Sequence, residues 1–388
     1  MKLLVAVSTI DLKYGLGCTP AWWQLLKAAH ECGHEVIVIP YLGRPIESLW
    51  WRTYENPCAL ESIVFNRYLK RRVKNGNSHN RKDRLSPVFN LLIKNYIKPK
   101  WERHLLNILA KEKHVDAVLA MNIPVNHISG IPSRIRQMMG IPVIYYDGDM
   151  PTILPRYATK RGFKFSYYED ADLSEYDAFL TNSKGCIADL GKMGAENVHP
   201  LYYGIDPRLC SLVKVEEHID VSFYGHGSNF REEWMSKLIT IPSREMPEMN
   251  FIVAGRNFKM DLGNAKIISD PSYSEWRELI CGSKINLNIT RWSHTNIYAS
   301  STSRPFELAA FGACIVSQPY KGIEEWFEVG KEIIVVNSEE EAIEVYKWLL
   351  ANPEERRKIG KKARERVLKE HTFQHRAKEL IRIIKELK

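Results

Sequence analysis

Short apolar segments alternate with helical segments along the whole chain, and this alternation restricts the fold more than any other feature of the sequence. At the N-terminus, Leu3–Val7 is predicted to be a strand. Thr19 followed by Pro20 is typical of a helix start, because a hydroxyl can cap the helix and proline suits its first position. Gly33 ends that helix, and Glu35–Pro40 is the next apolar strand. Buried strands that alternate with helices predict a parallel sheet covered on both faces.

The alternation falls into two consecutive series that join near residues 204–215. The first series continues with strands at Asp116–Met121, Ile141–Tyr146, Asp177–Thr181 and Asn197–Tyr203. The second series has strands at Asp220–Tyr224, Asn250–Ala254, Lys266–Ile268, Lys284–Ile289, Cys314–Ser317 and Ile333–Val336. The sequence therefore predicts an α/β protein with an N-terminal domain at residues 1–204 and a C-terminal domain at residues 205–370. Because open parallel sheets bind ligands at the carboxyl ends of their strands, we expect a site in the cleft between the domains.

The composition restricts the class and the compartment of the protein. A chain of 388 residues with 45% hydrophobic and 26% charged residues can bury a core, which excludes a disordered or collagen-like chain. The seven cysteines are scattered and form no CxxC pair, which argues against a disulfide framework and a cysteine metal site. No apolar run approaches the length of a transmembrane helix. We expect a cytoplasmic protein, with any membrane contact limited to the inner membrane face.

The net charge of +9 comes from one segment. Residues 67–113 contain 14 Lys and Arg against 3 Asp and Glu. Two helices are predicted around them, Pro57–Lys74 and Pro87–Lys113, and Pro99 is expected to kink or break the second. An apolar stripe runs along the second helix through Phe89, Leu92, Ile93, Tyr96, Ile97, Trp101, Leu105, Ile108 and Leu109. The segment fits a basic face for anionic lipid headgroups or a lipid-phosphate acceptor, or a stripe packed on the sheet. Nucleic acid is disfavoured, because no binding motif is present.

The segment from Ser303 to Glu307 has the pattern of a helix start that can bind phosphate. The free N–H groups and the positive dipole end of a helix attract an anion, and Arg304 adds a guanidinium suited to phosphate. Glu307 lies one turn further on the same face, where it could accept hydrogen bonds from ribose hydroxyls. The alternative is a capped helix with an Arg–Glu surface pair.

A second candidate phosphate site is the glycine-rich turn at the end of a predicted strand. Gly225 and Gly227 allow close backbone approach to a phosphate, and Arg231 follows them. Three more residues at strand ends or helix starts would line the same pocket, namely Arg256, Tyr273 and Arg291. The alternatives are a solvated arginine at position 231 and a packing role for Tyr273.

Two loops of the first domain are candidates for the acceptor side. Gly15 and Gly17 follow the first strand without forming a G-x-G-x-x-G dinucleotide fingerprint. Asp147-Gly148-Asp149 follows the strand at Ile141–Tyr146. This triplet fits a plain turn, a divalent metal site, or a carboxylate at Asp147 or Asp149 that orients an acceptor hydroxyl.

Several of these segments together resemble the two-domain (GT-B) glycosyltransferases. The likeness covers residues 177–380 and is carried by Asn182–Val198, Leu201–Pro207, Ser303–Val316, Gly322–Glu332 and Ala351–Phe373. Within that class the chain is similar to glycosyltransferases related to the spore maturation protein CgeB and to the glycosyltransferase family 4-like group.

The resemblance implies two Rossmann-like domains facing a central cleft, with a last helix at residues 371–388 that packs back on the N-terminal domain. It implies transfer of a sugar from a nucleotide diphosphate sugar, with a UDP-sugar as the first candidate, to a glycan, lipid-linked or protein acceptor, as in polysaccharide biosynthesis. A retaining, metal-independent reaction without a cofactor is implied, with Arg231, Arg304 and Asp149 in catalytic roles. One departure is Ala299, where many relatives have a glutamate. A nucleotide-sugar epimerase and a non-catalytic sugar-nucleotide-binding protein are the alternatives.

Overall fold

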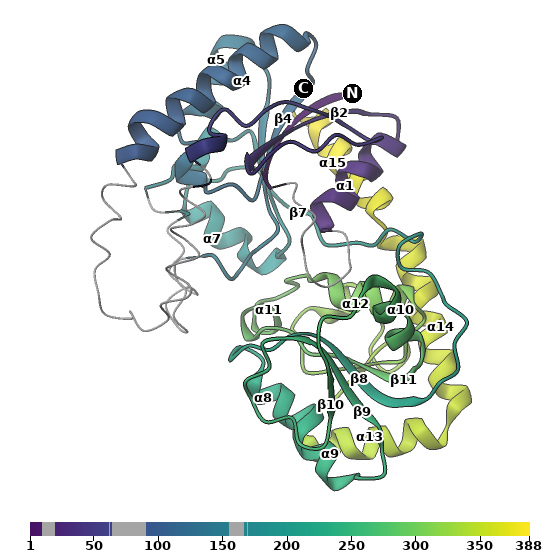
Figure 1. The fold of residues 1–388 in the computed structure, drawn as a ribbon. Coiled ribbons are helices and arrows are strands. Elements are labelled where there is room, and N and C mark those ends of the chain that lie inside the picture. The colour runs from purple at the N-terminus through teal and green to yellow at the C-terminus, as the bar shows by residue number, and fades with distance from the viewer. Residues whose placement is uncertain (10–19, 62, 64–90, 155–166, 169) are drawn as a thin grey trace.

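The computed structural model describes residues 1–9, 20–61, 63, 91–154, 167–168 and 170–388. Within these residues the chain forms two α/β domains, which lie one above the other in Figure 1. Each domain contains one sheet, and all the strands of each sheet run parallel. The fold class that the alternation predicts is therefore confirmed.

The N-terminal sheet has seven strands in the order β3-β2-β1-β4-β5-β6-β7. They are β1 (Lys2–Thr9), β2 (Glu35–Leu42), β3 (Arg52–Thr53), β4 (Ala117–Met121), β5 (Val143–Asp147), β6 (Ala178–Thr181) and β7 (Val198–Pro200). Val5 in β1 pairs with Val38 in β2 and with Leu119 in β4, so the first strand lies inside the sheet. Six of the seven strands match the prediction, whereas β3 is an edge strand too short to show a periodicity.

The C-terminal sheet has six strands in the order β10-β9-β8-β11-β12-β13. They are β8 (Ile219–His226), β9 (Phe251–Arg256), β10 (Lys266–Ile268), β11 (Ser283–Asn288), β12 (Ile315–Ser317) and β13 (Ile334–Val335). All six match predicted strands. The sequence predicts them well because they are short apolar runs bounded by helices, as expected for strands buried on both faces.

Helices pack on both faces of each sheet, so each domain has two apolar layers. In the N-terminal domain they include α1 (Ala21–Glu31), α4 (Lys98–Glu112), α5 (Ile131–Met139) and α7 (Ile187–Lys192). In the C-terminal domain they are α8 (Glu232–Met235), α9 (Ile241–Glu245), α10 (Tyr273–Cys281), α11 (Trp292–Asn296), α12 (Ser303–Ala310), α13 (Glu339–Ala351) and α14 (Pro353–Glu370). A π-helical turn at Ser236–Thr240 joins α8 to α9, so the backbone is helical from Glu232 to Glu245.

The last helix, α15 (Phe373–Glu386), leaves the C-terminal domain and packs against α1 (Figure 1). Its side chains Phe373, Leu380 and Ile384 are buried in the same apolar layer as the inner face of α1. The chain thus crosses between the domains twice. The two crossings are hydrogen-bonded to each other, since Ile205 and Phe373 form part of a short parallel pair around His371 and Thr372.

The second helix of the basic segment is described from Leu91 onwards. A π-helical turn at Ile93–Ile97 runs directly into α4, and the backbone stays helical at the residues before Pro99. Of the kink or break expected at Pro99, the break does not occur, because the wider π turn accommodates the missing N–H of the proline.

The apolar stripe of this helix packs mainly on the N-terminal sheet. Its buried members are Ile93, Ile97, Trp101, Leu105, Ile108 and Leu109. Leu92 and Tyr96 are exposed together with Leu91. Phe89 and most of the predicted helix Pro57–Lys74 lie outside the described residues. In the described part of the chain, no helix combines the length and apolar character needed to cross a bilayer.

Candidate active site

The loops at the carboxyl ends of both sheets meet at the domain interface. In the N-terminal domain β5 ends at Asp147, and in the C-terminal domain β11 ends at Asn288. The hydroxyl groups of Thr152 and Ser293, which follow these two strands, lie 3.3 Å apart. The residues that follow parallel strands in both domains are therefore brought together, which is the geometry of a ligand site.

Arg304 is fixed at the start of α12 by the ends of two strands. Its Nε donates to the carbonyl oxygen of Tyr224 at 3.1 Å, and its Nη1 donates to that of Ile289 at 2.6 Å. The guanidinium also lies over the ring of Phe223, 4.9 Å from its centroid. Two of the donors of Arg304 are thus used within the domain, which holds the guanidinium in place at the carboxyl end of β8.

The glycines at the end of β8 allow this packing. A Cβ on Gly225 would lie 2.5 Å from Nη2 of Arg304, and a Cβ on Gly227 would lie 2.4 Å from the carbonyl oxygen of Asn257. The sequence predicts that the backbone of these glycines approaches a phosphate closely. In the structure the groups that approach them closely are Arg304 and the backbone of Asn257. Gly225 serves the site by making room for the arginine.

Arg231 lies beside this turn with unused hydrogen-bonding capacity. Its Nη1 donates to the carbonyl oxygen of His226 at 2.6 Å, while its Nε is buried and has no partner among the described residues. The buried Oγ of Ser228 is in the same situation. Burial, followed by the charges of Arg304 and Arg291, holds the pKa of Arg231 far below its usual range. Buried donors of this kind are usually satisfied, so they indicate a missing ligand or solvent.

Four arginines surround His226, and burial together with their charges lowers the pKa of its imidazole. They are Arg231, Arg256, Arg291 and Arg304, which the sequence predicts as donor-site or catalytic residues. Arg256 forms an ion pair with Asp270, and Glu307 lies near Arg304. Asp149, whose carboxyl is affected by the charge of Arg291, is a third negative group. Four positive and three negative groups leave an excess of one positive charge, which favours an anionic ligand.

Glu307 lies one turn into α12, as predicted, but it is nearly fully buried. Burial raises the pKa of its carboxyl, and Arg304 and the hydroxyl of Ser303 act in the opposite direction. The Arg–Glu pair is thus an interior feature of the site, and the alternative of a surface pair is excluded.

Tyr273 is the first residue of α10. Its hydroxyl donates to the carbonyl oxygen of Leu209 in the interdomain linker, and its ring packs against Trp276 at 5.8 Å between centroids. The structure therefore gives Tyr273 the packing role that the sequence left open.

Asp147 is fully buried, which corrects its interpretation as an acceptor-side residue. Its carboxylate accepts hydrogen bonds from the hydroxyl of Tyr168 and from the backbone N–H of Asp149, the latter at 2.9 Å. Burial, reinforced by the charge of Asp149, raises its pKa to about 7. Both hydrogen bonds of the Asp147 carboxylate are made within the N-terminal domain. No cluster of three or more His, Cys, Asp or Glu suited to a metal occurs in the described residues.

Asp149 is the other carboxylate of this loop. Its side chain is exposed, yet the surrounding protein excludes enough water to raise its pKa. Arg291, from the loop after β11, acts in the opposite direction across the interface. The structure thus places Asp149 near Arg291 of the arginine cluster. Gly15 and Gly17, the other residues predicted for the acceptor side, lie outside the described residues.

Sequence reasoning missed the residues that hold the Asp147–Asp149 loop. The backbone N–H of Gly148 donates to Oδ1 of Asn122 at 2.7 Å, and the hydroxyl of Tyr203 donates to the carbonyl oxygen of Gly148 at 2.8 Å. Asn122 follows β4 directly and Tyr203 follows β7 closely. Their position after predicted strands is the signal that could have identified them.

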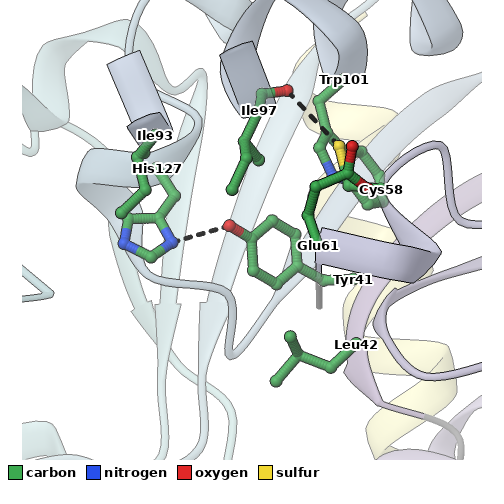
Figure 2. A pocket seen from close by; sticks show the side chains of 8 residues that line it. All are labelled: Tyr41, Leu42, Cys58, Glu61, Ile93, Ile97, Trp101 and His127. Atoms are coloured by element: carbon green, nitrogen blue, oxygen red, sulfur yellow. Dashed lines mark hydrogen bonds between the residues drawn. The ribbon is translucent and has the colours of Figure 1, made fainter. Parts of the chain in front are cut away.

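A separate small pocket lies in the N-terminal domain, behind the carboxyl end of β2 (Figure 2). It is lined by Tyr41, Leu42, Cys58, Glu61, Ile93, Ile97, Trp101 and His127. The hydroxyl of Tyr41 lies 2.7 Å from Nδ1 of His127, and burial lowers the pKa of that imidazole to about 4. Burial also raises the pKa of the Cys58 thiol to about 11. Neither the imidazole nor the thiol is charged at neutral pH, and Glu61, the charged residue of the lining, forms an ion pair with Lys100 at 2.8 Å.

Comparisons with known proteins agree with this geometry. Residues 231–382 match the family model described as glycosyl transferase-like. The structure resembles sucrose-phosphate synthase from Thermosynechococcus elongatus, with a TM-score of 0.69, 13% identity and coverage of 100% of this chain and 99% of that one. It also resembles HepE from Anabaena in complex with UDP and glucose, with a TM-score of 0.62, 10% identity and full coverage of both chains. A glycosyltransferase from Rickettsia africae has a TM-score of 0.63, 11% identity and coverage of 99% and 98%.

These structural likenesses define the class of the fold, which is GT-B, with two Rossmann-like domains. The family match covers residues 231–382, which is less than half of the chain, and the structural likenesses show the fold. No curated protein sequence matches the chain at a significant level. The likeness to the CgeB-related subgroup stays a prediction.

Proposed function

We propose that the chain transfers a sugar from a nucleoside diphosphate sugar, with a UDP-sugar as the first candidate donor, to an acceptor hydroxyl held against the N-terminal domain. The observation that carries this proposal is the arginine cluster around His226, with the unpartnered buried Nε of Arg231. Its excess of positive charge would offset part of the negative charge of a diphosphate diester. A structural neighbour, HepE, has been crystallised with UDP and with UDP-glucose, which supports a uridine donor.

In this proposal the C-terminal domain assists the departure of the diphosphate. Negative charge grows on the leaving oxygen as the bond to the sugar breaks, and Arg231, Arg304 and the N-terminus of α12 would stabilise that charge. Since the arginines supply positive charge at this position, we propose that transfer needs no metal ion. Glu307 would accept hydrogen bonds from the ribose.

The N-terminal domain would hold the acceptor. Asp149 faces Arg291 across the interface, where its carboxylate would orient the attacking hydroxyl. In a retaining reaction the departing diphosphate takes the proton of that hydroxyl, so no protein nucleophile is required. We propose a glycan, a lipid-linked sugar or a protein as the acceptor.

A thermal-shift series with UDP, GDP, ADP and dTDP tests donor binding, because a ligand that binds the native state raises the melting temperature by mass action. We expect UDP to give the largest shift. UDP release from UDP-glucose should then persist in EDTA, and loss of turnover in EDTA would contradict metal independence. Arg231→Ala and Glu307→Ala should lose turnover while staying folded, and wild-type turnover in both would refute the site.

A second candidate is a non-catalytic protein that binds sugar nucleotides. Ala299 favours it, because this residue replaces the glutamate of many relatives. Tight binding of UDP-glucose with neither hydrolysis nor transfer would support this candidate. An isomerised sugar after incubation with donor alone would instead indicate an epimerase.

A further inference from the structure

The N-terminal domain forms a short antiparallel contact with the segment that leads into α12. Three backbone hydrogen bonds make the contact: Gly185 N to Tyr298 O at 2.9 Å, Lys184 N to Ala299 O at 3.2 Å, and Ser301 N to Asn182 O at 2.8 Å. We call residues 182–185 and 298–301 the interdomain latch. The latch ends two residues before α12 begins at Ser303, so it lies directly against the start of the donor helix.

Buried side chains reinforce the latch. The hydroxyl groups of Ser183 and Ser300 lie 2.5 Å apart, and Nδ2 of Asn182 donates to the carbonyl oxygen of Ser301 at 2.9 Å. All four residues are fully buried. Because hydrogen bonds shielded from water are hard to replace, a polar contact of this kind holds one geometry.

The same residues reach the Asp147–Asp149 loop. The backbone N–H of Asn182 donates to the carbonyl oxygen of Asp147 at 3.2 Å. The backbone N–H of Tyr203 donates to Oγ of Ser301 at 3.0 Å, and its hydroxyl donates to the carbonyl oxygen of Gly148 at 2.8 Å. The loop that carries Asp149 and the segment that starts α12 are thus joined through Asn182 and Tyr203.

The latch requires a residue without a side chain at position 185. A Cβ on Gly185 would lie 2.8 Å from Cγ2 of Ile297 and 2.9 Å from the backbone nitrogen of Tyr298. Any larger residue would push the two strands of the latch apart. Gly191, six residues further along in α7, offers a matched control, because a Cβ added there would meet no described atom within 4 Å.

We infer that Gly185 and Ser301 are positioning residues for transfer, because the latch holds the Asp149 loop at a fixed place relative to the start of the donor helix. This inference rests on the proposed function of the two sites that the latch connects. Within the described part of the chain, neither residue forms a hydrogen bond with the arginine cluster, so neither should contribute to donor affinity directly. Displacing the two sites from each other by about 1 Å lowers the rate of a reaction roughly a hundredfold.

The test compares Gly185→Ala and Ser301→Ala with Gly191→Ala. UDP affinity is measured by calorimetry, turnover by UDP release from UDP-glucose with water as acceptor, and domain arrangement by small-angle X-ray scattering with hydrogen exchange. For Gly185→Ala we expect turnover at saturating donor to fall roughly 10- to 100-fold, UDP affinity to stay within about twofold, and the amides of the latch to exchange faster. Ser301→Ala should show a smaller loss of turnover, and Gly191→Ala none.

Wild-type turnover in both latch variants would overturn the inference, and so would an equal loss of turnover and UDP affinity. If the wild-type protein binds none of UDP, GDP, ADP and dTDP, the proposed function fails, and the physical measurements then decide about the latch. In that case unchanged scattering and unchanged hydrogen exchange in Gly185→Ala would refute the latch itself. Scattering from separated domains, together with slow exchange in the cores of both domains, would establish the latch as the element that fixes the domain arrangement.

Discussion

Arg231 and Arg304 have the same charged group, and their surroundings give them different parts in the site. Arg304 donates to the carbonyl oxygens of Tyr224 and Ile289, so its removal would disturb the ends of two strands. Arg231 keeps a buried Nε without a partner in the described chain. Both arginines receive the same interpretation from the sequence, because a motif carries the residue type but not the number of donors already in use.

The first prediction concerns Arg231. Replacing Arg231 by alanine should weaken UDP binding roughly 10- to 100-fold, because one or more charge-assisted hydrogen bonds are lost. The melting temperature should change little. Arg244→Ala, which removes an exposed partner of Asp261, is the control and should leave UDP affinity unchanged. Calorimetric titration measures both variants, and equal affinities for UDP in them would remove Arg231 from the site.

The second prediction concerns Asp147, whose pKa of about 7 lies above its ordinary value of 3.8. The folded state holds this proton more tightly than the unfolded state, so the free energy of unfolding falls as the pH rises from about 4 to 7. Asp147→Asn keeps an acceptor for Tyr168 and cannot ionise. Relative to wild type, this variant should therefore gain roughly 1–4 kcal/mol of stability between pH 4 and pH 7.5.

Urea unfolding of Asp147→Asn and wild type across this pH range measures the gain. Asp261→Asn, at an exposed position, serves as the control and should track the wild type more closely. A stability difference between Asp147→Asn and wild type that stays constant with pH would show that Asp147 is already ionised in the folded protein at pH 4.

At the scale of elements, the segment before α12 forms a contact between the two domains. Ala299 is fully buried with a positive φ of 44°, and its backbone N–H donates to Lys321 while its carbonyl accepts from Lys184. The backbone of Gly322 packs directly against it. The position at which many relatives have a glutamate is thus filled by an interdomain contact.

The third prediction follows from that packing. Ala299→Glu should not raise turnover, and it should lower stability by roughly 2–5 kcal/mol, because a carboxylate would be forced into a filled and dry space. Ala351→Glu, at the exposed end of α13, is the control and should be nearly neutral. Turnover of UDP-glucose and thermal melting measure both. Higher turnover in a stable Ala299→Glu protein would place this position in the sugar pocket.

At the scale of the whole molecule, the excess of positive charge lies in the domain that we propose to hold the acceptor. Residues 67–90 lie outside the described part of the chain, but the π-helical turn at Ile93–Ile97 and α4 carry exposed Lys94 and Arg103. Leu91, Leu92 and Tyr96 are exposed on the same helical stretch. Exposed apolar side chains beside basic ones are typical of a surface that binds anionic membranes.

The fourth prediction tests this surface. Reversing Lys94 and Arg103 together to glutamate should weaken binding to phosphatidylglycerol vesicles at least roughly tenfold, since each basic residue near such a membrane contributes about 1 kcal/mol. UDP affinity should be unchanged. Lys347→Glu with Lys361→Glu, in the C-terminal domain, is the matched control for net charge. Vesicle sedimentation that is equal in both double variants would show that the basic segment does not contact membranes.

The sequence by itself determined the class of the fold and the set of strands. Twelve of the thirteen described strands follow from short apolar runs between helices, because burial on both faces leaves a local signature in the chain. It also located Arg231, Arg256, Arg291 and Arg304, since the residues that follow parallel strands gather at one edge of the sheet.

Only the tertiary structure decided what those residues do. Asp147 is fully buried, whereas the carboxyl of Asp149 is affected by the charge of Arg291, although a single glycine separates the two aspartates. The hydroxyl of Tyr273 donates a hydrogen bond to the carbonyl oxygen of Leu209 in the linker. Asn182 donates a hydrogen bond to the carbonyl oxygen of Ser301, which lies 119 residues further along the chain. Local sequence carries propensity and periodicity, whereas desolvation and hydrogen-bond pairing depend on which distant groups occupy the space around a side chain.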